Sequence, residues 1–318
     1  MTFSLSTNWF ASRSMPAGDM ARAALEMGFD ALELGYRLTE AQGKEIARWV
    51  DIGDIAAPSV HAYCPEPAGV PSGHPELFLL ASTDPDESAL ALAFLKRTLE
   101  FAQRVNARAI VLHTGRVKHR WIHSNELLER AERLAEFGVD PMLDFSYRWR
   151  AKLNAWQRSR LATKHIAALN RQLDAVLPLC EKAGVMLCME NLPSSEAIPS
   201  DREAASIIAG RGSRFLRYWH DIGHAEIQAR MRWTPDAVET ALRLLPMTAG
   251  VHIHDVKHFS NDHQPPGQGQ INFKELSAYG AADVIRVLEP GPDISARDVR
   301  EGLAFIKKCW DGVRRSTS

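Results

Sequence analysis

The chain has 318 residues, 45% of them hydrophobic, so it is long enough to bury one large core as a single domain. Its 38 Lys and Arg residues nearly balance its 39 Asp and Glu residues, so no overall charge draws the chain to nucleic acid or to a membrane surface. The four cysteines are scattered, and no apolar stretch reaches the length of about 18 residues that a membrane span needs, so we expect a cytoplasmic protein without disulfides.

Short apolar segments alternate with helical patterns along the whole chain, as in consecutive βα units. The clearest helix begins after Asp84, where a capping Asp is followed by Pro85 and by two acidic residues. The expected strands are residues 3–9, 31–35, 58–63, 109–114, 185–191, 216–222, 250–256 and 284–290. This order predicts an α/β fold, a single (β/α)8 TIM barrel over residues 1–318.

One connection is too long for a single helix. Residues 116–160 are surplus between the fourth expected strand and the helix that precedes the fifth. The surplus interleaves tryptophans with arginines, namely Trp121, Trp149 and Trp156 with Arg120, Arg148, Arg150 and Arg158. We expect a helical insertion at the C-terminal rim of the barrel. It would be either a lid that binds substrate or a hairpin that packs on the barrel or on a second subunit, so a homo-oligomer stays open.

Four segments at the ends of expected strands carry side chains that suit a hard divalent cation. They are Glu190 in MEN, Asp221 in HDIGH, His252 in GVHIHD and Glu289 in VLEP. In a closed parallel barrel these strand ends meet at one rim. Three buried carboxylates without a cation would repel one another and take up protons. The sequence therefore predicts one divalent ion (Mn, Mg, Co or Zn) bound by these four residues, with His254 as a competing ligand on the same strand face as His252.

Three motifs support a family resemblance that covers nearly the whole chain. They are D-x-G-H at residues 221–224, H-x-x-D-x-K at 252–257 and GQG-x-I-x-F at 267–273. In their order and spacing, these segments resemble the xylose-isomerase-like barrel superfamily, which holds sugar isomerases, sugar 3-epimerases, inosose dehydratases and endonuclease IV.

The epimerase branch of this superfamily implies a function. The positions matching Glu190, Asp221, His252 and Glu289 bind one metal there, and the two glutamates, as catalytic residues, move protons on opposite sides of a sugar. The resemblance thus implies a metal-dependent isomerase or epimerase acting on a sugar, a keto-sugar or a sugar phosphate through an enediolate. A close alternative is elimination, in which a keto-sugar or an oxidised glycoside loses a group. The expected partner is a small carbohydrate.

Further histidines keep a third function open. His61, His113, His224 and His263 match positions at which endonuclease IV holds additional zinc ions, which would make this chain an abasic-site DNA endonuclease. Asn261 stands where that enzyme has an Asp. In sugar-handling relatives, histidines on the third and fourth strands instead bond substrate hydroxyls. A non-catalytic ligand-binding barrel is a further alternative, although it would require a broken ligand set.

The remaining polar candidates carry weaker signals. Lys257 matches a polar contact in relatives and would either hold a substrate oxygen or phosphate or be a surface lysine. Glu33 ends the second expected strand and would either reach the site or stabilise the barrel mouth. Gly267 to Gly269 predict a flexible turn rather than a nucleotide loop. Cys64 and Cys188 are expected to be core residues.

Overall fold

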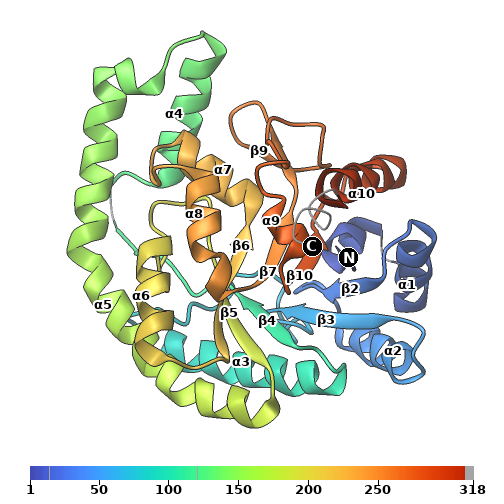
Figure 1. The fold of residues 1–318 in the computed structure, drawn as a ribbon. Helices are drawn as coiled ribbons and strands as arrows, with labels where there is room; N and C mark the ends of the chain where they lie inside the picture. The colour runs from blue at the N-terminus through green and yellow to red at the C-terminus, as the bar shows by residue number, and fades with distance from the viewer. Residues whose placement is uncertain (14, 120, 312–318) are drawn as a thin grey trace.

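Eight parallel strands close into a barrel in the order β1-β10-β7-β6-β5-β4-β3-β2 (Figure 1). The computed structural model describes residues 1–13, 15–119 and 121–311. The barrel strands are β1 (Ser4–Ser6), β2 (Ala31–Leu34), β3 (Ala56–His61), β4 (Ala109–Leu112), β5 (Met186–Glu190), β6 (Leu216–Asp221), β7 (Thr248–Ile253) and β10 (Ile285–Leu288). The predicted TIM barrel is therefore confirmed.

The expected strands run past the observed ones at several C-terminal ends. The chain leaves the first strand after Ser6 and enters a 3-10 helix, η1 (Thr7–Arg13), where the sequence predicted strand to residue 9. The difference arises because an apolar pattern records burial, which continues into the turns at the rim, where the backbone already leaves the sheet.

Helices lie around the barrel, and most of them bury apolar residues against it (Figure 1). They are α1 (Ala17–Glu26), α2 (Glu40–Asp51), α3 (Pro85–Arg104), α4 (Ser124–Glu136), α5 (Phe145–Ala183), α6 (Asp201–Arg211), α7 (Ile222–Arg230), α8 (Ala237–Leu244), α9 (Ala278–Ala281) and α10 (Ala296–Trp310). The side chain of Asp84 accepts a hydrogen bond from the backbone of Asp86, as the capping pattern before α3 predicted. None of the helices in the described residues is both long and apolar enough to cross a membrane.

Apolar side chains fill the barrel interior below the C-terminal ends of the strands. Only the C-terminal end of the interior is therefore left for a polar site. Within the apolar part, Trp219 is fully buried together with Val111, Cys188 and Val287. A side chain at Gly250 would lie 2.1 Å from the Trp219 ring, so this glycine makes room for the tryptophan. Packing of this kind leaves no channel through the barrel.

The strand predicted over residues 250–256 is divided into two elements. β7 ends at Ile253, and β8 (Asp255–Lys257) pairs antiparallel with β9 (Asn261–Gln264) above the rim. The Asp255 carboxylate accepts hydrogen bonds from the backbone N–H groups of Gly267, Gly269 and Ile271. The GQG turn is thus held by Asp255, which explains the glycine at 269, where a Cβ would lie 2.3 Å from that carboxylate.

The long connection between β4 and β5 is helical, and its helices form an arm beside the barrel (Figure 1). We call residues 121–160 the arm. α4 leads through η2 (Pro141–Leu143) into α5, which does not end near residue 160 but runs for 39 residues to Ala183. The helix is continuous because residues 145–177 contain neither Gly nor Pro, so nothing in this stretch interrupts it. Arg120 lies outside the described residues.

The arm packs against the outer side of the barrel rim. Its apolar residues Leu127 and Tyr147 are buried in one cluster with Ile227 and Met231 of the α7 region and with Val256 of β8. Near the base of the arm, the Glu196 carboxylate accepts hydrogen bonds from the backbone of Ser124 and from Asn154. These contacts fix the arm to the loop that follows β5.

Candidate metal centre

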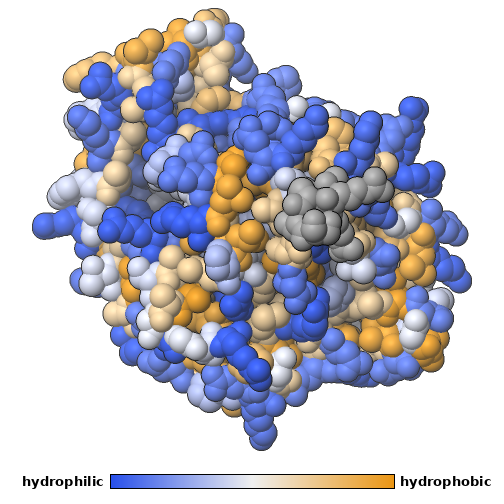
Figure 2. Space-filling model, viewed as in Figure 1, coloured by the Kyte–Doolittle hydropathy of each residue, from blue (hydrophilic) through white to orange (hydrophobic). Residues whose placement is uncertain are grey.

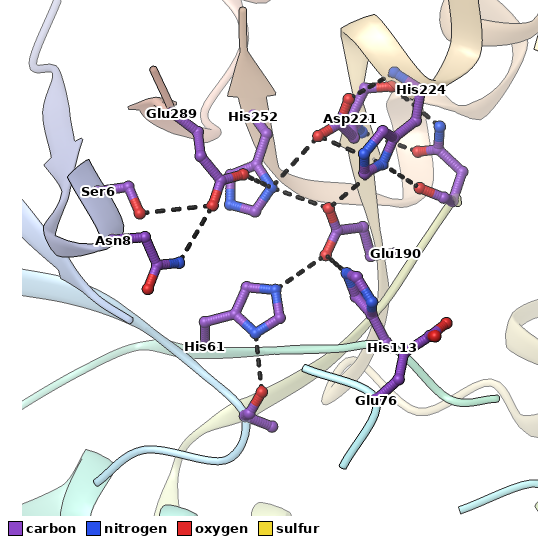
Figure 3. A network of polar contacts seen from close by, with 12 residues as sticks. Ser6, Asn8, His61, Glu76, His113, Glu190, Asp221, His224, His252 and Glu289 are labelled. Atoms are coloured by element: carbon purple, nitrogen blue, oxygen red, sulfur yellow. Dashed lines mark hydrogen bonds and ion pairs between the residues drawn. The ribbon is translucent and has the colours of Figure 1, made fainter. Parts of the chain in front are cut away.

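The four predicted ligands lie together at the C-terminal end of the barrel (Figure 3). Glu190 is the last residue of β5, Asp221 is the last residue of β6, His252 belongs to β7, and Glu289 follows β10. One nitrogen or oxygen atom from each lies within 4.8 Å of the others, and all four residues are buried. The register of the parallel strands, which pairs Asp221 with His252, produces this convergence.

His252 is at the centre of this group. Its Nδ1 lies 2.9 Å from Glu190 Oε1 and 3.1 Å from Glu289 Oε2. On the other side of the ring, Nε2 lies 2.8 Å from Oε1 of the buried Glu33. If Glu33 accepts the Nε2 proton, the Nδ1 lone pair is directed at the carboxylates, as in the carboxylate–histidine pairs that support bound metals.

The charges of this group suit a divalent cation. Burial raises the pKa of Glu190, but His252 and His113 hold it well below its usual range. Burial also raises the pKa of Asp221, but His224 and His254 together have the larger opposite effect and hold this pKa well below its usual range. Conversely, burial lowers the pKa of His252, whereas Glu289, Glu33 and Glu190 hold it well above its usual range. One imidazolium faces several buried carboxylates, so the group is rich in negative charge. A divalent cation that prefers oxygen and nitrogen ligands fits these carboxylate and imidazole donors.

A second group adjoins the first through Glu190. His61 donates Nδ1–H to the backbone oxygen of Ala62 at 2.9 Å, and its Nε2 lies 3.2 Å from Glu190 Oε2. His113 Nε2 lies 3.1 Å from the same oxygen. Glu190 therefore has one oxygen toward His252 and the other toward this histidine pair (Figure 3). His61, His113 and Glu190 also satisfy the spacing for holding an ion.

A third group consists of His224, His254 and His263. His224 and His263 place Nδ1 3.0 Å from the backbone oxygens of Asn191 and Glu289, which leaves their Nε2 atoms for another partner. His254 lies between this group and the first one. Its Nε2 is 3.0 Å from Asp221, and although burial lowers its pKa, Asp221 raises it to about 9.

The third group differs in composition from the zinc site that the likeness to endonuclease IV implies. Asn261, at the position where the nuclease has an Asp, is exposed on β9 and is not part of the group. His254 instead completes it. Gly223 in the D-x-G-H motif makes room for His254, because a Cβ there would lie 2.0 Å from the His254 ring.

Some expected site residues lie elsewhere. Lys257 is on β8, and its Nζ bonds Gln268 Oε1 at 3.1 Å instead of entering any of the three groups. Trp121, Trp149 and Trp156 of the arm are 51–61% exposed and take no part in these groups. The expectation for Cys64 and Cys188 is confirmed, since both are buried core residues.

Several supporting residues were not identified from the sequence. Asn191 accepts the Asp221 N–H through its Oδ1 and donates to the Asp221 backbone oxygen, which fixes the end of β6 against β5. Ser6 and Asn8, from the first unit, reach Glu289 Oε1 at 3.5 and 3.3 Å. Asn191 directly follows Glu190 in the MEN segment, so its position at a strand end was the available signal.

A sequence comparison places the chain in a family. The sequence profile described as xylose isomerase-like TIM barrel matches residues 21–309. The chain belongs to this family. A curated protein of Methanocaldococcus jannaschii, described as uncharacterized, is 25% identical over 202 residues, which are 62% of this chain and 61% of that relative. The chain therefore matches less than two thirds of that relative's length.

Solved structures extend the likeness over the full chain. A D-tagatose 3-epimerase-like protein is 19% identical, with a TM-score of 0.69 and complete coverage of both chains. The 3-keto-D-glucoside 4-epimerase of E. coli is 16% identical, with a TM-score of 0.68 over 97% of this chain and 100% of that one. A Thermus thermophilus protein soaked with ZnCl2 is 20% identical, with a TM-score of 0.60 over 98% of this chain and 99% of that one. At these identities the likeness shows a shared fold.

Proposed function

We propose that this protein is a divalent-metal-dependent isomerase or epimerase of a sugar, keto-sugar or sugar phosphate. The observation that carries the proposal is the buried group of Glu190, Asp221, His252 and Glu289 at the C-terminal end of the barrel. The names of the structural neighbours, which include tagatose and ribulose epimerases, support a carbohydrate substrate. A divalent ion held by this group would supply the positive charge that an enediolate needs.

Glu190 and Glu289 are suited to move protons. Both carboxylates are buried, and their pKa values are lowered, against the effect of burial, chiefly by His252. Each is therefore ionised and can accept a proton. Glu190 comes from β5 and Glu289 follows β10, so the two carboxylates would approach a bound sugar from different strands. One glutamate would remove a proton beside the carbonyl, and the other would return one.

Proton exchange with solvent tests this proposal directly. Purified protein loaded with Mn²⁺ is incubated in deuterated water with D-tagatose, D-fructose and a 3-keto-glucoside, and deuterium incorporation at carbon is measured by NMR. Glu190→Gln and Glu289→Gln should each abolish incorporation, whereas His224→Asn should retain more. If both glutamine variants keep their metal and still exchange at the wild-type rate, the enediolate mechanism is wrong.

The same assay separates epimerisation from elimination. Both reactions begin with abstraction of a proton beside a carbonyl, but elimination expels a hydroxyl or an aglycone instead of returning the proton. Epimerisation yields an isomer whose mass differs only by the incorporated deuterium, whereas elimination yields an unsaturated product that is lighter by the expelled water or aglycone. Mass spectrometry of the reaction mixture therefore assigns one of the two outcomes.

A second candidate function is metal-dependent hydrolysis of a phosphoester, as in an abasic-site endonuclease. The observation that favours it is the presence of two further histidine groups beside the first, one of which shares Glu190. Several adjacent ions activate water and stabilise both oxygens of a displaced phosphate. The net charge of −1 provides no general attraction to DNA.

Metal counting combined with a cleavage assay discriminates between the two functions. Inductively coupled plasma mass spectrometry on the purified protein should give one tightly held ion per chain for the epimerase, and His61→Ala should not change that number. Two or three ions, a loss on His61→Ala and cleavage of a duplex that contains an abasic site would favour the nuclease instead.

A further inference from the structure

A cavity of about 470 Å³ lies between the arm and the barrel. Its walls come from α5 of the arm, from the loop after β5 with the first turn of α6, and from the end of α7 with the following turn. None of the residues in the three metal-ligand groups lines it. Its volume is within the range of about 300–1,000 Å³ that small-molecule sites occupy. It is therefore large enough for a ligand and distinct from the candidate metal centre.

Two buried acceptor atoms on the cavity wall have no hydrogen-bond partner in the described part of the chain. They are Oδ2 of Asp201 and Oε1 of Gln228. Both side chains are 94% buried, because each residue is 6% exposed. The other polar atoms of these side chains are in use, since Tyr218 donates to Asp201 Oδ1 at 2.7 Å and Gln228 donates to the Leu192 oxygen at 2.6 Å. Because buried polar atoms are as a rule hydrogen-bonded, each of these two acceptors is suited to take a further donor.

The arm side of the cavity carries positive charge. Arg148 and Lys152 line the cavity from consecutive turns of α5, and no carboxylate in the described residues pairs with either of them. Arg158 and Arg232 also line the cavity, but they are paired with Glu203 and Asp140. Arg148 and Lys152 therefore add positive charge to the arm side of the cavity, whereas the residues that carry the buried acceptors belong to its barrel side.

Apolar side chains provide the remaining wall. They are Met142, Ala151, Ala155, Ala197, Met231 and Trp233. A methionine and an aromatic ring make favourable contacts with a flat apolar body, and the alanines leave room for it.

We propose that this cavity binds a small organic anion that has a flat apolar body, a hydroxyl or amide donor at one end and a carboxylate or phosphate at the other. The donor would bond Asp201 and Gln228, and the anionic group would lie against Arg148 and Lys152. The site goes beyond the proposed reaction, because its residues do not belong to the metal centre. The cavity is linked to the segment that carries the centre, since Gln228 bonds the Leu192 oxygen two residues after Glu190.

The test uses 6-hydroxy-2-naphthoate, a fluorescent probe with an aromatic body, a hydroxyl at one end and a carboxylate at the other. Isothermal titration calorimetry on the full chain should show saturable binding at one site. Lys152→Glu should weaken binding by about tenfold or more, because it replaces an attraction by a repulsion. Ala155→Phe should also abolish binding by filling the cavity. Probes that lack one group, namely 2-naphthoate and 2-naphthol, should bind more weakly than the complete probe.

Matched controls keep the result specific. Lys164→Glu makes the same charge change on an exposed residue of α5 that does not line the cavity, so it should leave the affinity unchanged. Binding should persist when EDTA removes metal, which separates this site from the metal centre whatever reaction that centre performs. The proposal is overturned if the folded protein does not bind the probe, if Lys152→Glu and Lys164→Glu bind it equally, or if EDTA abolishes binding.

Discussion

Glu33 contacts the candidate metal centre through His252 and is not one of its four predicted ligands. It accepts a hydrogen bond from Ser59 and faces His252 Nε2, on the side of the ring away from the other carboxylates. A carboxylate in this position fixes the orientation and the tautomer of the imidazole. The sequence placed Glu33 at a strand end but could not separate a contact with the site from a role at the barrel mouth, because the distinction depends on which ring nitrogen it meets.

We therefore expect Glu33→Gln to weaken metal binding by about 10- to 100-fold, the usual effect of losing an outer-shell partner. The change removes the charge that favours the Nε2 proton but keeps the shape of the side chain. Competition with a chromophoric zinc chelator measures the affinity. Glu26→Gln, on the exposed face of α1, is the control and should bind as the wild type does. Equal affinities for the two variants would leave Glu33 with a purely structural role.

Residue identity was predictable wherever a strand ended in a chemically distinctive side chain. Glu190, Asp221, His252 and Glu289 could be grouped because parallel strands in a barrel end at the same rim. Hydrogen-bond direction was not predictable, since it depends on register and ring orientation. His254 illustrates this, because its ring points to Asp221 and to the third histidine group, which its spacing from His252 alone did not reveal.

At the scale of elements, the arm is the least predictable part of the fold. The sequence indicated that the arm is helical, but it did not show where the arm ends. The reason is that α5 runs without a break from the arm to the barrel. The tryptophans of the arm are exposed and belong to none of the three histidine and carboxylate groups of the candidate metal centre. Large apolar side chains instead remain exposed along α5 and at the outer end of the arm, where hydrophobic residues are visible in Figure 2.

We call five of these residues the arm face: Phe137, Leu143, Phe145, Trp149 and Trp156, which are 51–83% exposed. On α5, the positions of Phe145, Trp149 and Trp156 share one side of the helix. The exposed area of the five side chains is on the order of 700 Å², close to the roughly 800 Å² that each partner buries in a standard interface. A second copy of the chain is a suitable partner, because two such faces would cover each other.

We expect the protein to self-associate through the arm face. The double variant Phe145→Ser with Trp149→Ser should shift the species observed by analytical ultracentrifugation from dimer to monomer, because it removes the aromatic centre of the interface. Ile52→Ser serves as the control, since Ile52 is 69% exposed but lies after α2, on another part of the surface. A wild-type protein that sediments as a monomer, or a dimer that the double variant does not dissociate, would contradict this prediction.

At the scale of the whole molecule, barrel closure joins the two ends of the chain at the site. β1 pairs with both β2 and β10, and the ring of Phe3 beside β1 stacks on Trp310 of α10 at 6.2 Å. This closure brings Ser6 and Asn8 to Glu289, more than 280 residues later. The alternation of apolar and helical segments predicted the barrel. The same pattern could not predict these contacts across its closing seam.

Because the centre combines residues from across the barrel, metal binding should stabilise the entire fold. An ion at 100 times its dissociation constant adds about 2.7 kcal/mol to the free energy of unfolding if it binds only the native state, enough to raise Tm by several degrees. Differential scanning calorimetry of the protein in EDTA and in excess Mn²⁺ measures this difference. His252→Ala should remove most of it.

The stabilisation by metal should increase with pH. The pKa of His252 is raised in the folded, metal-free protein, where this cation lies among carboxylates. Its contribution to the free energy of unfolding is therefore complete below the unfolded pKa of about 6.5 and is lost as pH rises through the folded pKa. A bound ion replaces that proton, so binding releases it and becomes tighter at higher pH. The difference in Tm between Mn²⁺-loaded and EDTA-treated protein should therefore be larger at pH 8 than at pH 6. A difference that shrinks over this interval would show that proton release from His252 does not accompany binding.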